Sequence, residues 1–239
     1  MTGERSRFGK MFCVKDFYEY LDTIAPFDRQ ESWDNSGLLV GAPEQRVDTV
    51  AVALDITPEA VHWAEKEGAQ LFVSHHPVIF HAQKQFLAQE PAYLLAQAGM
   101  SAICAHTSLD VAQGGVNDVL AERLGLAAVE VVPAQEGAPL LRIGRVEPMD
   151  AQALAGLVSR RLHAAVRMAA VDGEQRITRV AICGGAGADL MAEAHYETEN
   201  PVADVLAQKL SARFPGVRVV RIPQENPVAW VQFNGKESL

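Results

Sequence analysis

The sequence is poor in cysteine, and its three cysteines are far apart. They stand at positions 13, 104 and 183 of a 239-residue chain, without a C-x-x-C pair. A disulfide framework or a thiolate zinc site needs several cysteines at short spacing, so neither is expected. Unpaired thiols are typical of a reducing compartment, and we therefore expect a cytoplasmic protein.

Long apolar runs and clusters of basic residues are also missing. No apolar run approaches the ~20 residues that a membrane helix needs. The opening "MTGERSRFGKMF" lacks the apolar core of a secretory signal. The formal net charge is −9, and no stripe of lysine and arginine offers the surface that nucleic acids bind. We therefore expect neither a membrane nor a nucleic acid as partner.

What the sequence does contain is an alternation of apolar strands and amphipathic helices. Hydrophobic residues make up 49% and charged residues 21%, as in an ordinary globular protein. Strands are predicted at 47–55, 71–74 and 102–105, and helices at 14–24, 58–68, 91–97 and 116–124. Strands that alternate with helices usually form a parallel sheet, so the expected fold class is α/β with a mainly parallel sheet.

The pattern starts again after Gly125. Strands are predicted at 129–133, 140–147, 177–183 and 217–222, with helices from Asp150 to about His163 and from Asn200–Pro201 onward. This repetition predicts two α/β lobes, residues 1–126 and residues 127–239.

Three pairs of polar residues stand out because they combine imidazoles with carboxylates. They are His75 with His76, His106 with Asp110, and His195 with Glu199. The first two pairs directly follow apolar strands, where ligands collect in parallel α/β sheets. The third has the four-residue spacing of one helix face. Nitrogen and hard oxygen donors without thiolate suit zinc, iron, manganese, cobalt or nickel.

Each pair also has an ordinary structural explanation. A histidine doublet is common in hydrogen-bonded turns, Asp110 is suited to capping a turn, and His195 with Glu199 is a common surface pair. The joint occurrence of all three pairs favours a metal site over these separate explanations.

Two further stretches of the sequence each have two possible roles. "CGGAGADL" is either a phosphate-binding loop or a tight turn. Trp33 and Asn35 in "SWDNSGLLVG" either line a pocket or fix their loop.

Five motifs together resemble a known family. "WDNSGLLVG", "SHHPVIF", "HTSLDVAQGGVNDVLAERLGL", "CGGAGADL" and "HYETE", in this order, closely resemble the GTP cyclohydrolase 1 type 2 homologues, also called Nif-three-like dinuclear metal-centre proteins. The resemblance runs from about Val14 to Pro223. It implies two α/β lobes around a dinuclear site, two divalent transition-metal ions as cofactors, and a toroidal homohexamer.

The resemblance also implies which residues bind the metals. His76 and Asp110 would hold one ion, His75 and His195 the other, and Glu199 would bridge both. No catalytic side chain is assigned by the resemblance or by the sequence.

The chain departs from this family in its second lobe. Members usually carry a further helix–strand unit, with a Thr-Gly-Asp/Glu signature, between the glycine-rich turn and the "HY-x-x-E" motif. Here only ten residues separate Gly184 from His195, and Ala194 replaces the usual glycine. The second lobe is therefore expected to be shortened.

Two functions from different classes follow from these patterns. Two metals held close together lower the pKa of a shared water and stabilise a displacement reaction. The leading hypothesis is therefore a metal-dependent hydrolase that acts on a nucleotide or another phosphoester. The alternative is a non-catalytic metal-binding or regulatory hexameric scaffold.

Overall fold

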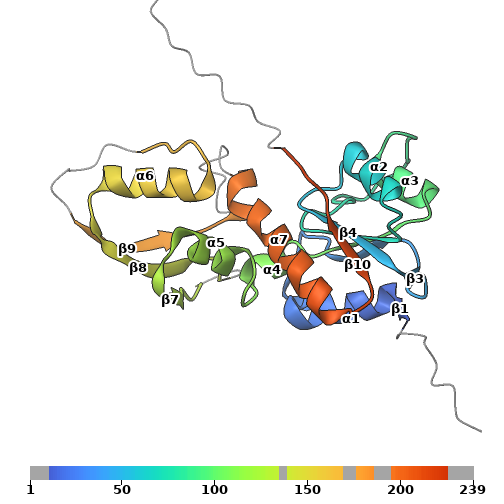
Figure 1. Ribbon diagram of the computed structural model, residues 1–239, viewed down its shortest axis with the longest axis horizontal. Coiled ribbons are helices and arrows are strands. Elements are labelled where there is room, and N and C mark those ends of the chain that lie inside the picture. Colours follow the sequence, from blue (N-terminus) through green and yellow to red (C-terminus); the bar gives the residue numbers. More distant parts are fainter. Residues whose placement is uncertain (1–10, 135–138, 169–175, 186–194, 226–239) are drawn as a thin grey trace, which may run out of the picture.

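The computed structural model describes residues 11–134, 139–168, 176–185 and 195–225. Two sheets lie at opposite ends of the long axis, and helices α5 (Val116–Leu124) and α7 (His195–Arg213) run between them (Figure 1). This confirms the α/β class with a mainly parallel main sheet. Among the described residues, none of the helices has the length and apolar character needed to cross a membrane.

The main sheet has five strands, four of them parallel. Their order across the sheet is β10 (Arg218–Arg221), β4 (Thr49–Ala53), β5 (Leu71–Ser74), β6 (Ser101–Cys104) and an antiparallel edge strand, β2 (Gly37–Val40). Strands β4, β5 and β6 are buried at every residue. Parallel strands are covered on both faces, which explains their continuous apolar sequences.

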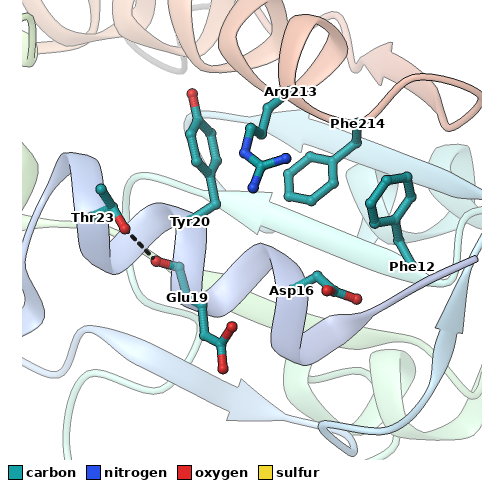
Figure 2. A pocket seen from close by; sticks show the side chains of 7 residues that line it. All are labelled: Phe12, Asp16, Glu19, Tyr20, Thr23, Arg213 and Phe214. Atoms are coloured by element: carbon teal, nitrogen blue, oxygen red, sulfur yellow. Dashed lines mark hydrogen bonds between the residues drawn. The ribbon is translucent and has the colours of Figure 1, made fainter. Parts of the chain in front are cut away.

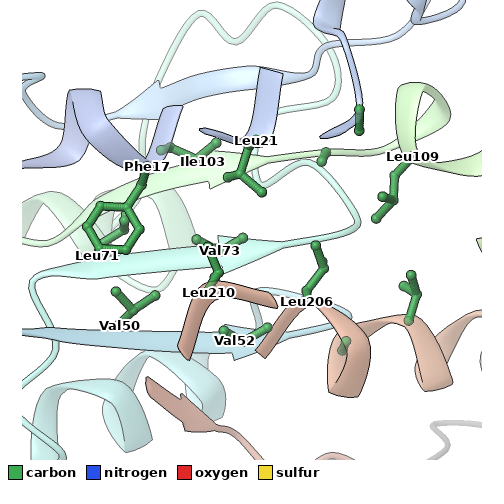
Figure 3. Close-up of a cluster of buried hydrophobic side chains, with 14 of the residues drawn as sticks. Phe17, Leu21, Val50, Val52, Leu71, Val73, Ile103, Leu109, Leu206 and Leu210 are labelled. Atoms are coloured by element: carbon green, nitrogen blue, oxygen red, sulfur yellow. The ribbon is translucent and has the colours of Figure 1, made fainter. Parts of the chain in front are cut away.

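Helices cover both faces of this sheet. Alternate residues of β4 point to opposite sides, so Val50 and Val52 belong to one apolar core while Ala51 and Ala53 belong to the other. Helices α1 (Val14–Ile24) and α7 pack on the valine side, where their side chains meet those of the strands (Figure 3). Helices α2 (Pro58–Lys66) and α3 (Pro91–Gln97) pack on the alanine side.

Two of the predicted helices begin after a side chain that caps them. The Thr57 side chain accepts a hydrogen bond from the Ala60 N–H at the start of α2. Asp150 does the same for the Ala153 N–H at the start of α6 (Ala151–Leu162). Such caps satisfy N–H groups that the first helical turn leaves unpaired.

The second sheet is smaller and antiparallel. It consists of β7 (Ala127–Val131), β8 (Arg142–Met149) and β9 (Ile177–Ile182), in that order. Leu162 of α6 and Ile182 of β9 join residues of α5 in a small core. The remaining elements are short: β1 (Phe12–Cys13) paired with β3 (Arg46–Val47), the 3₁₀ turn η1 (Phe27–Arg29) and α4 (Thr107–Val111).

The C-terminal part of the chain differs from the sequence prediction in two respects. Helix α7 begins at His195, not at Asn200–Pro201, so the proline lies inside the helix. Strand β10 pairs with β4 in the main sheet, although the predicted division places residues 127–239 in the second lobe. The apolar side of α7 explains the return, because Leu206, Leu210 and the following Phe214 are buried in the core of the main sheet.

Candidate metal centre

The candidate ligands gather at the carboxyl ends of the strands in the main sheet. His75 and His76 directly follow β5, His106 lies two residues after β6, and Asp110 lies on α4. Glu199 reaches the same place from the first turns of α7. Parallel strands end at one edge of their sheet, so residues from separate loops meet there.

His75 is fully buried and faces two carboxylates. Its Nδ1 lies 2.9 Å from the Ala105 carbonyl oxygen, whereas its Nε2 lies 3.5 Å from Asp110 Oδ1 and 3.8 Å from Glu199 Oε1. Burial by itself lowers the pKa of His75, but the charges of Asp110 and Glu199 raise it above its usual value. Burial raises the pKa of Asp110.

Two buried atoms in this group lack a hydrogen-bond partner among the described residues. They are His75 Nε2 and Asp110 Oδ1. When Nδ1 of a neutral imidazole donates to a carbonyl, Nε2 is an acceptor and cannot donate to a carboxylate. Two buried acceptors that face each other are unfavourable unless a proton or a cation lies between them. The arrangement therefore fits a cation.

His76 continues this cluster toward the protein surface. Its Nδ1 lies 2.6 Å from Asp55 Oδ1, and its Nε2 lies 2.8 Å from Glu199 Oε2. Burial opposes the charged form of His76, but the hydrogen bonds with Asp55 and Glu199 outweigh it and raise the pKa of His76 to about 10. Glu199 thus turns one oxygen toward His75 and the other toward His76.

His106 is held by a network that begins at Asp34. Asp34 Oδ1 lies 2.8 Å from His106 Nδ1, and Asp34 Oδ2 accepts hydrogen bonds from the Thr107 N–H at 3.0 Å and the Ser36 hydroxyl at 3.1 Å. Burial opposes ionisation of Asp34, but the hydrogen bonds from His106 and Thr107 hold its pKa well below the usual range. Asp34 is therefore a fixed negative charge that orients the imidazole.

All three histidines share this arrangement. Each Nδ1 contacts an oxygen acceptor, from Ala105, Asp55 or Asp34. Metal-binding histidines typically direct their second nitrogen to such an acceptor, which fixes the ring and its tautomer. In the described part of the chain, two candidate metal-binding groups result, and the ligand atoms of each lie within 4.8 Å of one another: His75, His76 and His106, and His75, Asp110 and Glu199.

The glycine-rich turn after β9 runs against these carboxylates. Asn117 fixes it, since its Nδ2 donates to the Asp110 carbonyl and its Oδ1 accepts from the Gly184 N–H. Gly185 has a φ of +67°, and a Cβ at this position would lie 2.5 Å from Glu199 Oε1. Close approach to Glu199 therefore requires glycine here. Residues 186–190 of the same motif lie outside the described part of the chain.

Gln224, after β10, holds the backbone that carries Asp55. Its side-chain oxygen accepts from the N–H groups of Leu54 and Asp55 at 3.0 and 3.2 Å, and its amide donates to the Asp55 carbonyl at 3.0 Å. The Tyr196 hydroxyl of α7 donates to the Gln224 carbonyl at 2.6 Å. Gln224 also lines a cavity of about 360 Å³ beside His76.

A second cavity, of about 420 Å³, lies far from this cluster. It lies between α1 and the last turn of α7, with the Arg213 guanidinium 5.7 Å from the Tyr20 ring centroid and 5.4 Å from that of Phe214 (Figure 2). Fourteen residues of helix, or ~21 Å, separate Arg213 from Glu199. Because the lining of this second cavity combines acidic and basic side chains, it indicates no single class of ligand.

The structure brings together four of the five ligands that the resemblance implies: His75, His76, Asp110 and Glu199. The fifth, His195, begins α7, but its side chain lies outside the described part of the chain. Asp110 lies beside His75, whereas the resemblance groups it with His76.

Three contributors were not assigned a role from the sequence. His106 is a candidate in the sequence but is not in the ligand set that the resemblance implies, and neither Asp34 nor Asp55 is a candidate there. A signal existed for both carboxylates. Asp55 ends an apolar strand run, and Asp34 is the acidic residue of the "WDNSG" loop.

The chain is similar in sequence to named proteins. A protein of Lactococcus lactis named GTP cyclohydrolase 1 type 2 homolog is 33% identical over 188 residues, which cover 76% of this chain and 72% of that protein. A Staphylococcus aureus protein of the same name is 37% identical over 126 residues, which cover 52% of this chain but only 34% of the relative.

Solved structures share the fold. A hypothetical protein of Staphylococcus aureus superimposes with a TM-score of 0.79 at 23% identity, covering 92% of this chain and 99% of that chain. A Bacillus cereus protein related to NIF3 gives 0.79 at 19% identity, covering 93% and 100%. Residues 12–195 match the profile of one family. The chain belongs to the Duf34/NIF3 (NGG1p interacting factor 3) family.

Proposed function

We propose that this protein binds two divalent transition-metal ions and uses them to hydrolyse a nucleotide or another phosphoester. The observation that carries the proposal is the buried, unpartnered pair of His75 Nε2 and Asp110 Oδ1, which face each other at 3.5 Å. The names of the relatives, which refer to a GTP cyclohydrolase, are consistent with a nucleotide substrate.

The proposed ligands are those that the geometry gathers, with one addition. Glu199 is suited to bridging two ions, because its two oxygens face different histidines. Asp110 and His75 lie on its Oε1 side, and His76 lies on its Oε2 side with His106 close by. His195 is added on the family resemblance and on its position one helical turn before Glu199.

Bound divalent ions would supply Lewis acidity and a water of lowered pKa. The chain itself supplies charge and orientation, through Asp110 and Glu199 and through the acceptors that fix each imidazole. Its nearby thiol and hydroxyl are unsuited to nucleophilic attack. Burial raises the pKa of Cys104 well above its usual value, and the thiol contacts the His75 carbonyl. The Ser74 hydroxyl donates to the His76 carbonyl at 2.7 Å.

Metal analysis of purified protein, together with hydrolysis assays, tests the proposal. Wild-type protein loaded with zinc, manganese or iron should hold two ions per chain and hydrolyse a nucleotide or a generic phosphodiester. Glu199→Gln should lose ions and activity, whereas Glu65→Gln, at an exposed position of α2, should retain both. A wild-type chain that takes up no metal would refute the proposal. Stoichiometric metal without any turnover would favour the non-catalytic scaffold.

We also propose that the chain assembles with copies of itself, as a homohexamer on the family resemblance. Supporting this, apolar side chains are exposed at Val129 and Val131 of β7 and at Leu141, directly before β8. Apolar side chains exposed together on one strand fit a protein–protein contact. Light scattering should give a mass several times that of the chain, and Val131→Glu should reduce it. A monomeric wild-type protein would contradict this assembly.

A further inference from the structure

Two exposed aromatic side chains lie beside the candidate metal centre. Trp33 is 51% exposed and Phe80 is 38% exposed, and their ring centroids lie 5.9 Å apart. Each ring also contacts His106, with centroid distances of 6.2 and 6.1 Å. Large aromatic side chains usually bury most of their surface, so two that remain exposed next to a candidate ligand require an explanation.

The loops that carry these rings are fixed to each other and to the metal centre. The Asn35 side chain donates a hydrogen bond to the Ile79 carbonyl at 2.6 Å, which joins the Trp33 loop to the residue before Phe80. Asp34, between Trp33 and Asn35, holds His106. Three consecutive residues thus present a ring, orient a candidate ligand and fasten the facing loop, so the aromatic pair has a set position relative to the imidazole.

We propose that Trp33 and Phe80 form a subsite for a planar heteroaromatic ring of the substrate, such as a nucleobase. This inference rests on the proposed metal-dependent function and narrows its substrate from phosphoesters in general to nucleotides. The rings meet His106 nearly edge-on, at interplanar angles of 74° and 79°, so neither stacks its face on the imidazole. Stacking of a base on an aromatic side chain contributes ~1–3 kcal/mol.

The position of the pair determines which part of a nucleotide each region would contact. The ring centroids of Trp33 and Phe80 lie 6.2 and 6.1 Å from that of His106. His106 belongs to the group that also contains His75 and His76. A base on the rings therefore leaves the attached sugar phosphate close to the metal-binding groups. A phosphoester without a base would contact only the metal-binding groups and lose the stacking energy.

Binding measurements on metal-loaded protein test this subsite. Equilibrium dialysis would compare adenosine 5′-monophosphate with ribose 5-phosphate, which has no base. Wild-type protein should bind the nucleotide about tenfold more tightly, equivalent to ~1.4 kcal/mol. Trp33→Ala and Phe80→Ala should each reduce this preference toward one without changing ribose 5-phosphate binding. Trp33→Phe should retain most of it. Trp63→Ala removes a similarly exposed tryptophan from α2 and should have no effect.

Failure of the subsite and failure of the metal centre give different results. Equal affinity for the two ligands in metal-replete wild-type protein, or a preference that Trp33→Ala leaves intact, would overturn the subsite. A change in oligomeric state in Trp33→Ala without a change in nucleotide preference would also overturn it and assign the rings to contact with a second copy. If the chain takes up no metal, the proposed function fails. Binding of uncharged adenosine to the metal-free protein then tests the subsite separately. Loss of adenosine binding in Trp33→Ala supports the subsite, and no loss refutes it.

Discussion

The strands of the second sheet are at least as long as those of the main sheet, but they are much less buried. In the main sheet, β4, β5 and β6 are buried at every residue, whereas β7 of the second sheet is exposed at every residue. The main sheet has helices on both faces, and the second sheet shares only a small core with α5 and α6. Every described candidate ligand comes from the segments that directly follow β5 and β6, from α4 or from α7. Stability and the metal centre should therefore depend on the same half of the molecule.

Phe214→Ala should have the largest effect, because it removes a ring from the core of the main sheet. Phe214 is buried, stacks on Phe17 with a centroid distance of 3.9 Å and contacts Phe12 edge-on at 5.0 Å. We expect the free energy of unfolding to fall by about 3–5 kcal/mol, measured by urea denaturation. A loss below about 1 kcal/mol would show that this core does not dominate stability.

Leu162→Ala makes the corresponding change in the core of the second sheet. Leu162 is 9% exposed and belongs to a cluster of only six buried residues. We expect the free energy of unfolding to fall by about 2 kcal/mol. This is the lower end of the range for leucine truncation, because a small core relaxes more easily around a cavity. Metal content should stay at the wild-type value. If Leu162→Ala loses metal, the two halves are coupled and the comparison above is wrong.

Gly185→Ala tests the contact, within the described residues, between the segment that follows β9 and the candidate metal centre. The new methyl would lie 2.5 Å from Glu199 Oε1, so metal affinity should fall at least tenfold, or ~1.4 kcal/mol. Gly68→Ala is the matched control, because Gly68 has nearly the same φ (+69° against +67°) but nothing within 4 Å of the added Cβ. Both variants should lose about 1 kcal/mol of stability from backbone strain. Titration calorimetry that finds equal metal affinity in both would exclude the steric explanation.

Val131→Thr should have the smallest effect. Val131 is 53% exposed on β7, so the free energy of unfolding of the monomer should change by less than about 0.5 kcal/mol. The same substitution at Val73, which is fully buried in β5, places a hydroxyl in an apolar core and should cost about 1–3 kcal/mol. Equal losses in urea unfolding, measured at a protein concentration where the chain is monomeric, would contradict the exposed position of β7.

Local sequence patterns predict the elements of the main sheet well. The apolar runs at 47–55, 71–74 and 102–105 correspond to β4, β5 and β6, and the helices predicted at 58–68 and from Asp150 correspond to α2 and α6. The position of His75 and His76 was predictable because they directly follow a buried strand. All of these inferences use residues that are neighbours in the sequence.

Contacts between distant segments were not predictable in the same way. Nothing in "VRVVRI" specifies β4 as its partner, since an apolar strand of this kind fits either sheet. The pairing of Asp34 with His106 spans 72 residues, and that of Asp55 with His76 spans 21, so both depend on how the loops fold over the sheet edge. The predicted start of this last helix at Asn200–Pro201 is wrong because proline usually marks a helix beginning, whereas Pro201 lies inside α7.

The return of the chain to β4 also sets an order for biosynthesis. While the ribosome makes the polypeptide from its N-terminus, β4 can pair with β5 as soon as both have emerged, but its other edge stays unpaired until residues 218–221 appear. That edge belongs to a strand that is buried at every residue in the folded chain, and an unpaired strand edge of this kind recruits chaperones or aggregates. The hydrogen bonds that hold the backbone of Asp55 also cannot form until Gln224 has been synthesised. Metal uptake would then come after synthesis of nearly the whole described chain, and an interrupted translation product would have an exposed strand edge and an unsupported Asp55.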